Sequence, residues 1–155
     1  MRKLYGTLVA ALVALSLIAA GQAQAQVQVP RVFVTVLSSE NEVPGCPQGV
    51  ESGARGLAVI LIKPKTGEIR YWVVAWNLPG TIAGSPGAHI HVGAPGEAGP
   101  IVQPLQLTGR EVGLVAAGTA TNPALAQAIL ANPENYYVNV HTTVCPAGAI
   151  RGQLG

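Results

Sequence analysis

The stretch that decides the fold is residues 56–77, GLAVILIKPKTGEIRYWVVAWN. It holds two apolar runs, residues 56–62 and 68–77, which are rich in β-branched and aromatic residues. Between them lies Pro64-Lys65-Thr66-Gly67, where Gly67 can adopt the positive φ of a tight turn. This pattern predicts a β-hairpin. The first run is apolar on both of its faces, so we expect it to be a central strand.

Nineteen glycines and 12 prolines divide the rest of the chain into similarly short runs. One segment is typical of a helix instead, because Asn122 is a good N-cap, Pro123 suits the first helical position and Asn132-Pro133 ends it. We predict an all-β fold, an antiparallel Greek-key-like β-sandwich or barrel (immunoglobulin-like or superoxide-dismutase-like) with one short helix. The strands are expected at residues 27–37, 56–62, 68–77, 88–92, 101–107, 111–117, 136–142 and 149–154.

The amino-terminal segment has the pattern of a signal peptide. Arg2 and Lys3 precede an apolar run, and Ala23-Gln24-Ala25 has the small-x-small pattern of a cleavage site. We predict a signal peptide at residues 1–25 and one β domain at residues 26–155, secreted or periplasmic. No transmembrane segment is expected after cleavage.

Charge excludes one class of partner and suggests another. Without residues 1–25 the chain has seven basic and seven acidic residues, and the basic ones are scattered. Nothing resembles the basic stripe that a phosphate backbone requires, so we expect no nucleic acid partner. Charged residues make up only 10% of the chain. So few charges suggest a surface that is either rich in loops with neutral polar residues or partly covered by a partner such as a protein or the cell envelope.

The chain has two cysteines, Cys46 and Cys145. In an exported protein such a pair is expected to form a disulfide. The alternative is that they are metal ligands or free thiols, but neither has a second cysteine or a histidine at metal-ligand spacing. We therefore favour the disulfide.

All three histidines lie in strand-like motifs. Ala88-His-Ile-His-Val-Gly93 contains His89 and His91, and Tyr137-Val-Asn-Val-His-Thr142 contains His141. Alternate side chains of a strand share a face, so His89 and His91 project together. If the two strands are neighbours, the three imidazoles could form a site for zinc or copper. In the alternative, each histidine donates to a loop carbonyl and has only a structural role.

Three further residues are predicted to support such a site. Tyr137, Asn139 and Glu42 could orient the imidazole rings. A Ser-His-Asp triad is impossible because the chain contains no aspartate. Whether the chain is an enzyme is left open, with the non-enzymatic interpretation favoured. For Arg151 we expect a structural role in a buried ion pair, with Glu40 or Glu42 pairing with Arg151 or Arg70.

Six segments together resemble the CHRD domain family, which is named from chordin and includes bacterial exported proteins. They are Glu40-Asn-Glu-Val-Pro44, Gly53 with Gly56, residues 67–78, residues 88–93 with Gly99-Pro-Ile-Val102, residues 136–142, and Ile150-Arg-Gly-Gln-Leu154. The resemblance implies an all-β exported module without a settled biochemical activity. Alanine at Ala149 departs from the acidic residue that the family commonly has there. A shorter similarity, to copper/zinc superoxide dismutase, rests on the His-x-His strand and the glycine-rich carboxy-terminal segment.

Two functions follow as hypotheses. The first is an exported CHRD-like binding or structural module that is not an enzyme. The second is a metal-binding protein or metalloenzyme that uses His89, His91 and His141. The positions of the three rings discriminate between them.

Overall fold

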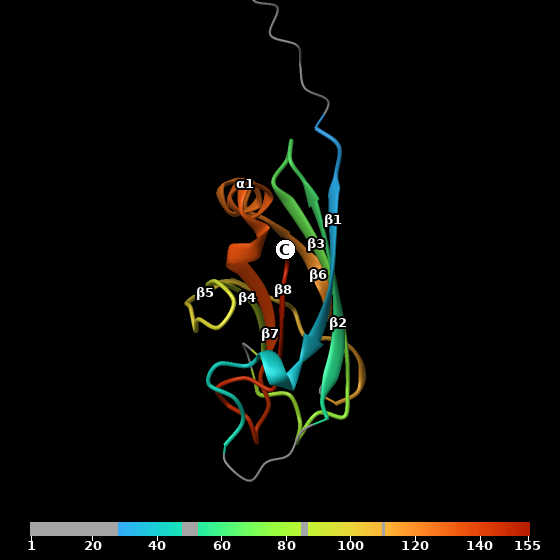
Figure 1. Cartoon of the computed structure of the whole chain (residues 1–155). Helices are drawn as coiled ribbons and strands as arrows, with labels where there is room; N and C mark the ends of the chain where they lie inside the picture. Colours follow the sequence, from blue (N-terminus) through green and yellow to red (C-terminus); the bar gives the residue numbers. More distant parts are fainter. Residues whose placement is uncertain (1–27, 48–52, 85–86, 110) are drawn as a thin grey trace, which may run out of the picture.

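The computed structural model describes residues 28–47, 53–84, 87–109 and 111–155 (Figure 1). The predicted signal peptide at residues 1–25 lies outside this part of the chain. The strands are β1 (Arg31–Ser38), β2 (Arg55–Lys63), β3 (Glu68–Trp76), β4 (Ala88–Val92), β5 (Ile101–Pro104), β6 (Gly113–Thr121), β7 (Tyr136–Val140) and β8 (Ile150–Gln153). The α-helix is α1 (Pro123–Ala131), and single 3₁₀ turns, η1 and η2, lie at Ser39–Asn41 and Pro133–Asn135.

All eight strands belong to one antiparallel sheet with the order β5-β4-β7-β8-β1-β2-β3-β6. The sheet curls into a half-barrel, so that β4, β7 and β8 lie across from β2 and β3 (Figure 1). The prediction of an antiparallel all-β fold with one short helix is confirmed. Its form is a single curled sheet.

The predicted hairpin joins β2 and β3. Lys63 pairs with Glu68, and Gly67 has a φ of 69°. A Cβ on Gly67 would lie 2.4 Å from Cα of Pro123, so a larger residue would displace the start of α1. The Gly67 carbonyl also accepts a hydrogen bond from the Asn122 amide at 3.0 Å. The hairpin turn therefore fixes the position of the helix.

The helix begins as its sequence predicts. Oδ1 of Asn122 accepts a hydrogen bond from the Leu125 amide at 3.1 Å, which is the N-cap interaction. Leu125 and Ile129 are buried, and α1 contacts β2 and β3. A helix of nine residues is too short to be stable in isolation, so this packing holds it in place.

The hydrophobic core fills the inside of the curl. One wall is formed by inward residues of β1, β2 and β3 such as Leu37, Ile60 and Val73, which are fully buried. The other wall is formed by residues of β4 and β7 such as Ile90 and Val138. These last two residues belong to the strands that contain the histidine motifs. The histidines therefore lie on the reverse side of a core-forming sheet.

Three strand boundaries differ by three or more residues from those predicted. The first strand begins at Arg31; of the three earlier described residues none is in a strand, and Val27 lies outside the described residues. β5 ends at Pro104, because the Gln106 amide donates to the Tyr71 hydroxyl at 3.0 Å instead of to a neighbouring strand. β6 continues to Thr121, since Gly118 fits against the Tyr71 ring and pairs with β3 where a break was expected.

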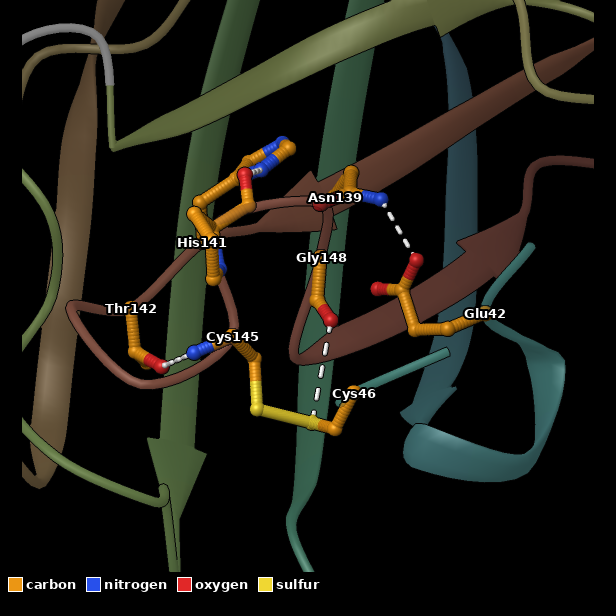
Figure 2. The surroundings of a disulfide bond; sticks show 8 residues. Glu42, Cys46, Asn139, His141, Thr142, Cys145 and Gly148 are labelled. Atoms are coloured by element: carbon orange, nitrogen blue, oxygen red, sulfur yellow. Dashed lines mark hydrogen bonds between the residues drawn. A yellow bond between two sulfur atoms is a disulfide. The ribbon is translucent and has the colours of Figure 1, made fainter. Parts of the chain in front are cut away.

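The predicted disulfide is confirmed. Cys46 and Cys145 are joined at an S–S distance of 2.04 Å (Figure 2). The bond links the segment after η1 to the loop between β7 and β8, two loops that are far apart in the sequence. Within the part of the chain that the structure describes, no helix is long and apolar enough to cross a membrane.

Candidate metal site

His89 and His91 lie on the outer side of β4. In the pairing of β4 with β7, His89 lies opposite Asn139 and His91 opposite Tyr137. Both histidines are buried, with 2% and 7% of their surface exposed. The alternation predicted from the sequence is therefore present, with Ile90 in the core and the two imidazoles on the other face.

His141 follows directly after the last residue of β7 and its ring turns toward the pair on β4. The ring centroid of His141 lies 4.7 Å from that of His89 and 6.0 Å from that of His91. One ring nitrogen from each histidine can be chosen so that all three lie within 4.8 Å of one another. The structure thus brings together all three residues of the predicted cluster.

Backbone carbonyls fix the orientation of two of the rings. Nδ1 of His91 lies 2.8 Å from the Gly99 carbonyl oxygen, and Nδ1 of His141 lies 2.9 Å from that of Pro146. A carbonyl only accepts, so each Nδ1 carries the proton and each Nε2 presents a lone pair. Such carbonyl contacts commonly orient metal-ligating histidines. Nε2 of His141 is buried and has no hydrogen-bond partner.

The spacing of the ring nitrogens is close to that of a tetrahedral metal site. Nε2 of His91 lies 3.2 Å from Nδ1 of His89. Two nitrogens that bind one zinc at 2.0–2.1 Å with a tetrahedral angle lie about 3.3 Å apart. A hydrogen bond between the two imidazoles has a similar length, so this distance fits both interpretations of the cluster. The set of three nitrogens spans up to 4.8 Å, which is wider than this spacing.

Burial keeps the rings in the neutral form that binds metals. Desolvation lowers the pKa of His91, and the Gly99 hydrogen bond only partly opposes this effect. Desolvation likewise lowers the pKa of His141. At neutral pH both imidazoles are therefore unprotonated at Nε2, which is the state that a metal ligand requires.

The Tyr137 ring supports the His91 ring by stacking against it. The two rings are stacked, with centroids 4.7 Å apart and an angle of 8° between their planes. The Tyr137 hydroxyl accepts a hydrogen bond from the Gly99 amide at 3.0 Å. Tyr137 therefore holds both the His91 ring and the residue whose carbonyl orients that ring.

Arg151 lies on the other side of Tyr137 and corrects one prediction. Its guanidinium carbon is 3.5 Å from the Tyr137 ring centroid, and its nitrogens donate to the carbonyls of Glu97 and Ala94 at 2.7 and 2.8 Å. Among the described residues no carboxylate forms a salt bridge with it. The prediction of a buried ion pair was wrong. Backbone carbonyls of the glycine-rich loop, and not a carboxylate, accept hydrogen bonds from the Arg151 guanidinium.

The two glutamates of the Glu40-Asn-Glu42 segment have different environments. Glu40 forms a salt bridge with Arg55 at 2.6 Å, which is neither of the two arginines that the sequence suggested. Glu42 is 8% exposed, and its Oε2 accepts a hydrogen bond from Asn139 at 2.9 Å (Figure 2). Burial raises the pKa of Glu42 to about 8, against the opposing effects of Asn139 and Arg151. Glu42 therefore reaches the site through Asn139, which lies beside His89 in the strand pairing.

One interpretation of the sequence had the histidines donate to loop carbonyls, but it did not show which residues provide those carbonyls. Gly99 and Pro146 orient the rings through their carbonyls, and Gln153 donates to the carbonyls of Gly93 and Glu134 at 2.7 Å. A carbonyl contact leaves no signature in the side chains, so only the glycine-rich composition of the loop after β4 indicated a close approach. A Cβ on Gly99 would lie 1.6 Å from the Val92 carbonyl oxygen, so only glycine fits there.

A cavity of about 300 Å³ lies near the cluster but does not open onto it. The residues that line it are Glu40, Asn41, Val43, Pro95, Gly96, Arg151 and Gln153. None of the three histidines is among them. The rings are therefore covered by loops at this point.

The comparisons with known proteins identify one family. A family model described as the CHRD domain matches residues 33–154, which includes every residue of the cluster and of its supporting loops. No curated protein and no solved structure matches the chain.

Proposed function

Because the chain belongs to the CHRD domain family, we propose that it is an exported, non-enzymatic binding module that holds a zinc or copper ion at His89, His91 and His141. The family and the disulfide are compatible with a location outside the cytoplasm. The single observation that carries the proposal is the convergence of three ring nitrogens within 4.8 Å of one another.

The donor set favours a borderline metal. Three neutral imidazoles suit Zn²⁺ or Cu²⁺ and do not suit Mg²⁺ or Ca²⁺, which prefer oxygen ligands. Both cysteines are used in the disulfide, so no thiolate competes for the metal. The unpartnered Nε2 of His141 also supports the proposal, because a buried nitrogen without a partner is costly unless something occupies the position in front of it.

Burial supports a binding role over catalysis. Three protein ligands leave a fourth position for water or substrate, as in catalytic zinc sites. A substrate would have to reach rings of which two are at most 7% exposed, and the cavity described above is lined by other residues. The competing metalloenzyme hypothesis requires the covering loops to open.

Calorimetric titration of the purified protein with Zn²⁺ and Cu²⁺, after removal of metals by a chelator, tests the proposal. We expect one ion per chain with a dissociation constant in the micromolar range or below. His141→Gln changes the least buried of the three ligands and should lower the affinity at least about tenfold. Circular dichroism checks that the variant is folded.

Tyr137→Phe is the matched control. It keeps the three imidazoles and the ring stacked on His91 but removes the hydroxyl that holds Gly99. We expect the stoichiometry to stay at one, with a smaller loss of affinity than for His141→Gln. Absence of binding by the unmodified protein at micromolar metal would leave the hydrogen-bonded cluster as the correct interpretation.

A further inference from the structure

A second candidate binding surface is the side of β1, β2, β3 and β6 that faces away from the core. We call this surface the outer face. In Figure 1, α1, β7 and β8 lie on the inner side of these strands, and no helix or strand formed by the described residues covers the opposite side. Large apolar side chains are exposed there: Val34 and Val36 at 62%, Val32 at 55%, Leu114 at 46%, Trp76 at 44% and Trp72 at 41%. Between β1 and β3, the outward leucine and valine side chains of β2 join them into one surface.

Charges occur only toward the ends of these four strands and are mostly paired. At one end Lys63 and Arg70 bind Glu68 at 2.8 and 2.6 Å, which leaves one positive charge in excess. At the other end Arg55 binds Glu40. The first end therefore has an excess of positive charge and the second is balanced.

We propose that the outer face binds a second copy of this chain, related by a two-fold axis that runs across the strands. An apolar sheet face with its charges at the ends is complementary to itself, which is what an isologous dimer requires. Packed sheets of this kind lie about 10 Å apart with their strands nearly aligned. This inference does not depend on the metal site, which lies on a different part of the sheet.

The size of the outer face is sufficient for a dimer. Four strands spaced about 4.8 Å apart are roughly 19 Å wide, and nine residues of strand are roughly 30 Å long. The projected area is on the order of 570 Å², and the relief of the side chains raises the accessible area toward the roughly 800 Å² per partner of a standard interface.

The distribution of charge favours a two-fold axis across the strands over one along them. An axis across the strands makes the strands of the two copies antiparallel, so the positive end of each copy lies over the balanced Arg55–Glu40 end of the other. An axis along the strands would place two positive ends together. A lipid surface is a poorer match, because anionic headgroups attract clustered basic residues and here Glu68 neutralises part of the charge.

The oligomeric state of the purified protein tests the proposal. Sedimentation velocity should give twice the chain mass for the unmodified protein and the single mass for Val34→Glu. Ile101→Glu is the matched control, since Ile101 is 45% exposed but lies on β5 at the far edge of the sheet. It should remain a dimer. A monomeric unmodified protein, including one that binds neutral lipid vesicles through Val34, would overturn the proposal, as would a dimeric Val34→Glu.

A cross-linking experiment tests the axis. Val34, Val59, Trp72 and Ala117 form one row across the sheet, at the middle of the strands. An axis along this row places Val34 against Val34 of the second copy. Val32 then lies four residues, or about 13 Å along the strand, from Val32 of the second copy. A short bis-maleimide should therefore cross-link Val34→Cys and not Val32→Cys. The reverse result would overturn the proposed arrangement.

Discussion

At the scale of single residues, the site depends on histidine protons whose positions the backbone decides. The carbonyls of Gly99 and Pro146 accept hydrogen bonds from Nδ1–H of His91 and His141, so the Nε2 atom of each ring carries a lone pair. The same two hydrogen bonds are what a purely structural cluster would show. The structural and metal-binding interpretations therefore differ only in what lies between the converging ring nitrogens, which include Nδ1 of His89.

The buried Glu42 predicts how the stability of the fold depends on pH. Burial raises its pKa from 4.5 to about 8, so between these values the unfolded chain loses a proton that the folded chain keeps. The contribution of protonated Glu42 to the free energy of unfolding is complete below pH 4.5. It falls by up to about 1.4 kcal/mol per pH unit until about pH 8. Glu42→Gln cannot ionise and should lose less stability than the unmodified protein between pH 6.5 and 8.

Denaturant unfolding at several pH values measures this difference. The window lies above 6.5, the ordinary pKa of histidine, so the lowered pKa values of His91 and His141 contribute little there. Those two groups act in the opposite direction, since they destabilise the fold as the pH falls below 6.5. Equal slopes for the two proteins between pH 6.5 and 8 would show that Glu42 is ionised in the folded state.

At the scale of elements, three loops cover one strand face, and the disulfide ties two of them together. Cys145 precedes Pro146, whose carbonyl orients His141, and Cys46 lies in the segment that contains Glu42 (Figure 2). The outer side of β4 and β7 would otherwise expose a row of polar side chains. The loops convert this row into a buried cluster.

Opening the disulfide should weaken both the fold and the site. The bond closes a loop of 99 residues, for which the chain-entropy model gives up to about 4–5 kcal/mol. We expect the double variant Cys46→Ser/Cys145→Ser to have a lower melting temperature and a lower zinc affinity, because the loop that holds His141 is no longer tethered. Unchanged zinc affinity in a folded double variant would show that the loop holds His141 without the bond.

The elements differ in how far the sequence predicts them. The hairpin at 64–67 and the helix after Asn122 are set by local turn and capping chemistry, and both were predicted correctly. The ends of β5 and β6 were predicted wrongly, because the Tyr71 hydroxyl and the small Gly118 act across the sheet. A local pattern cannot show such a contact between distant segments.

At the scale of the whole molecule, the surfaces of the curled sheet differ in chemical character. The inside of the curl holds the core, and the outer side of β4, β7 and β8 holds the polar cluster. The outer face of β1, β2, β3 and β6 is apolar and exposed within the part of the chain that the structure describes. The low content of charged residues, 10%, reflects this division. The composition suggested that part of the surface carries few charges, but only the strand order shows which residues form the apolar face.

The same limit applies to the site. Alternation within residues 88–92 and 136–142 placed the histidines on common faces, which the pairing of β4 with β7 then brings together. The partner of Arg151 could not be predicted, because loop carbonyls stand where a carboxylate was expected. The sequence therefore indicated which side chains share a face, but not which backbone carbonyls the folded loops bring to them.

The most direct test of the proposed metal site is X-ray absorption at the zinc edge of protein loaded with one equivalent of Zn²⁺. We expect a first shell of nitrogen and oxygen at about 2.0–2.1 Å, with the multiple-scattering signature of three imidazoles, falling to two in His141→Gln. A shell without imidazole scattering, or zinc that is lost on dialysis, would contradict the account.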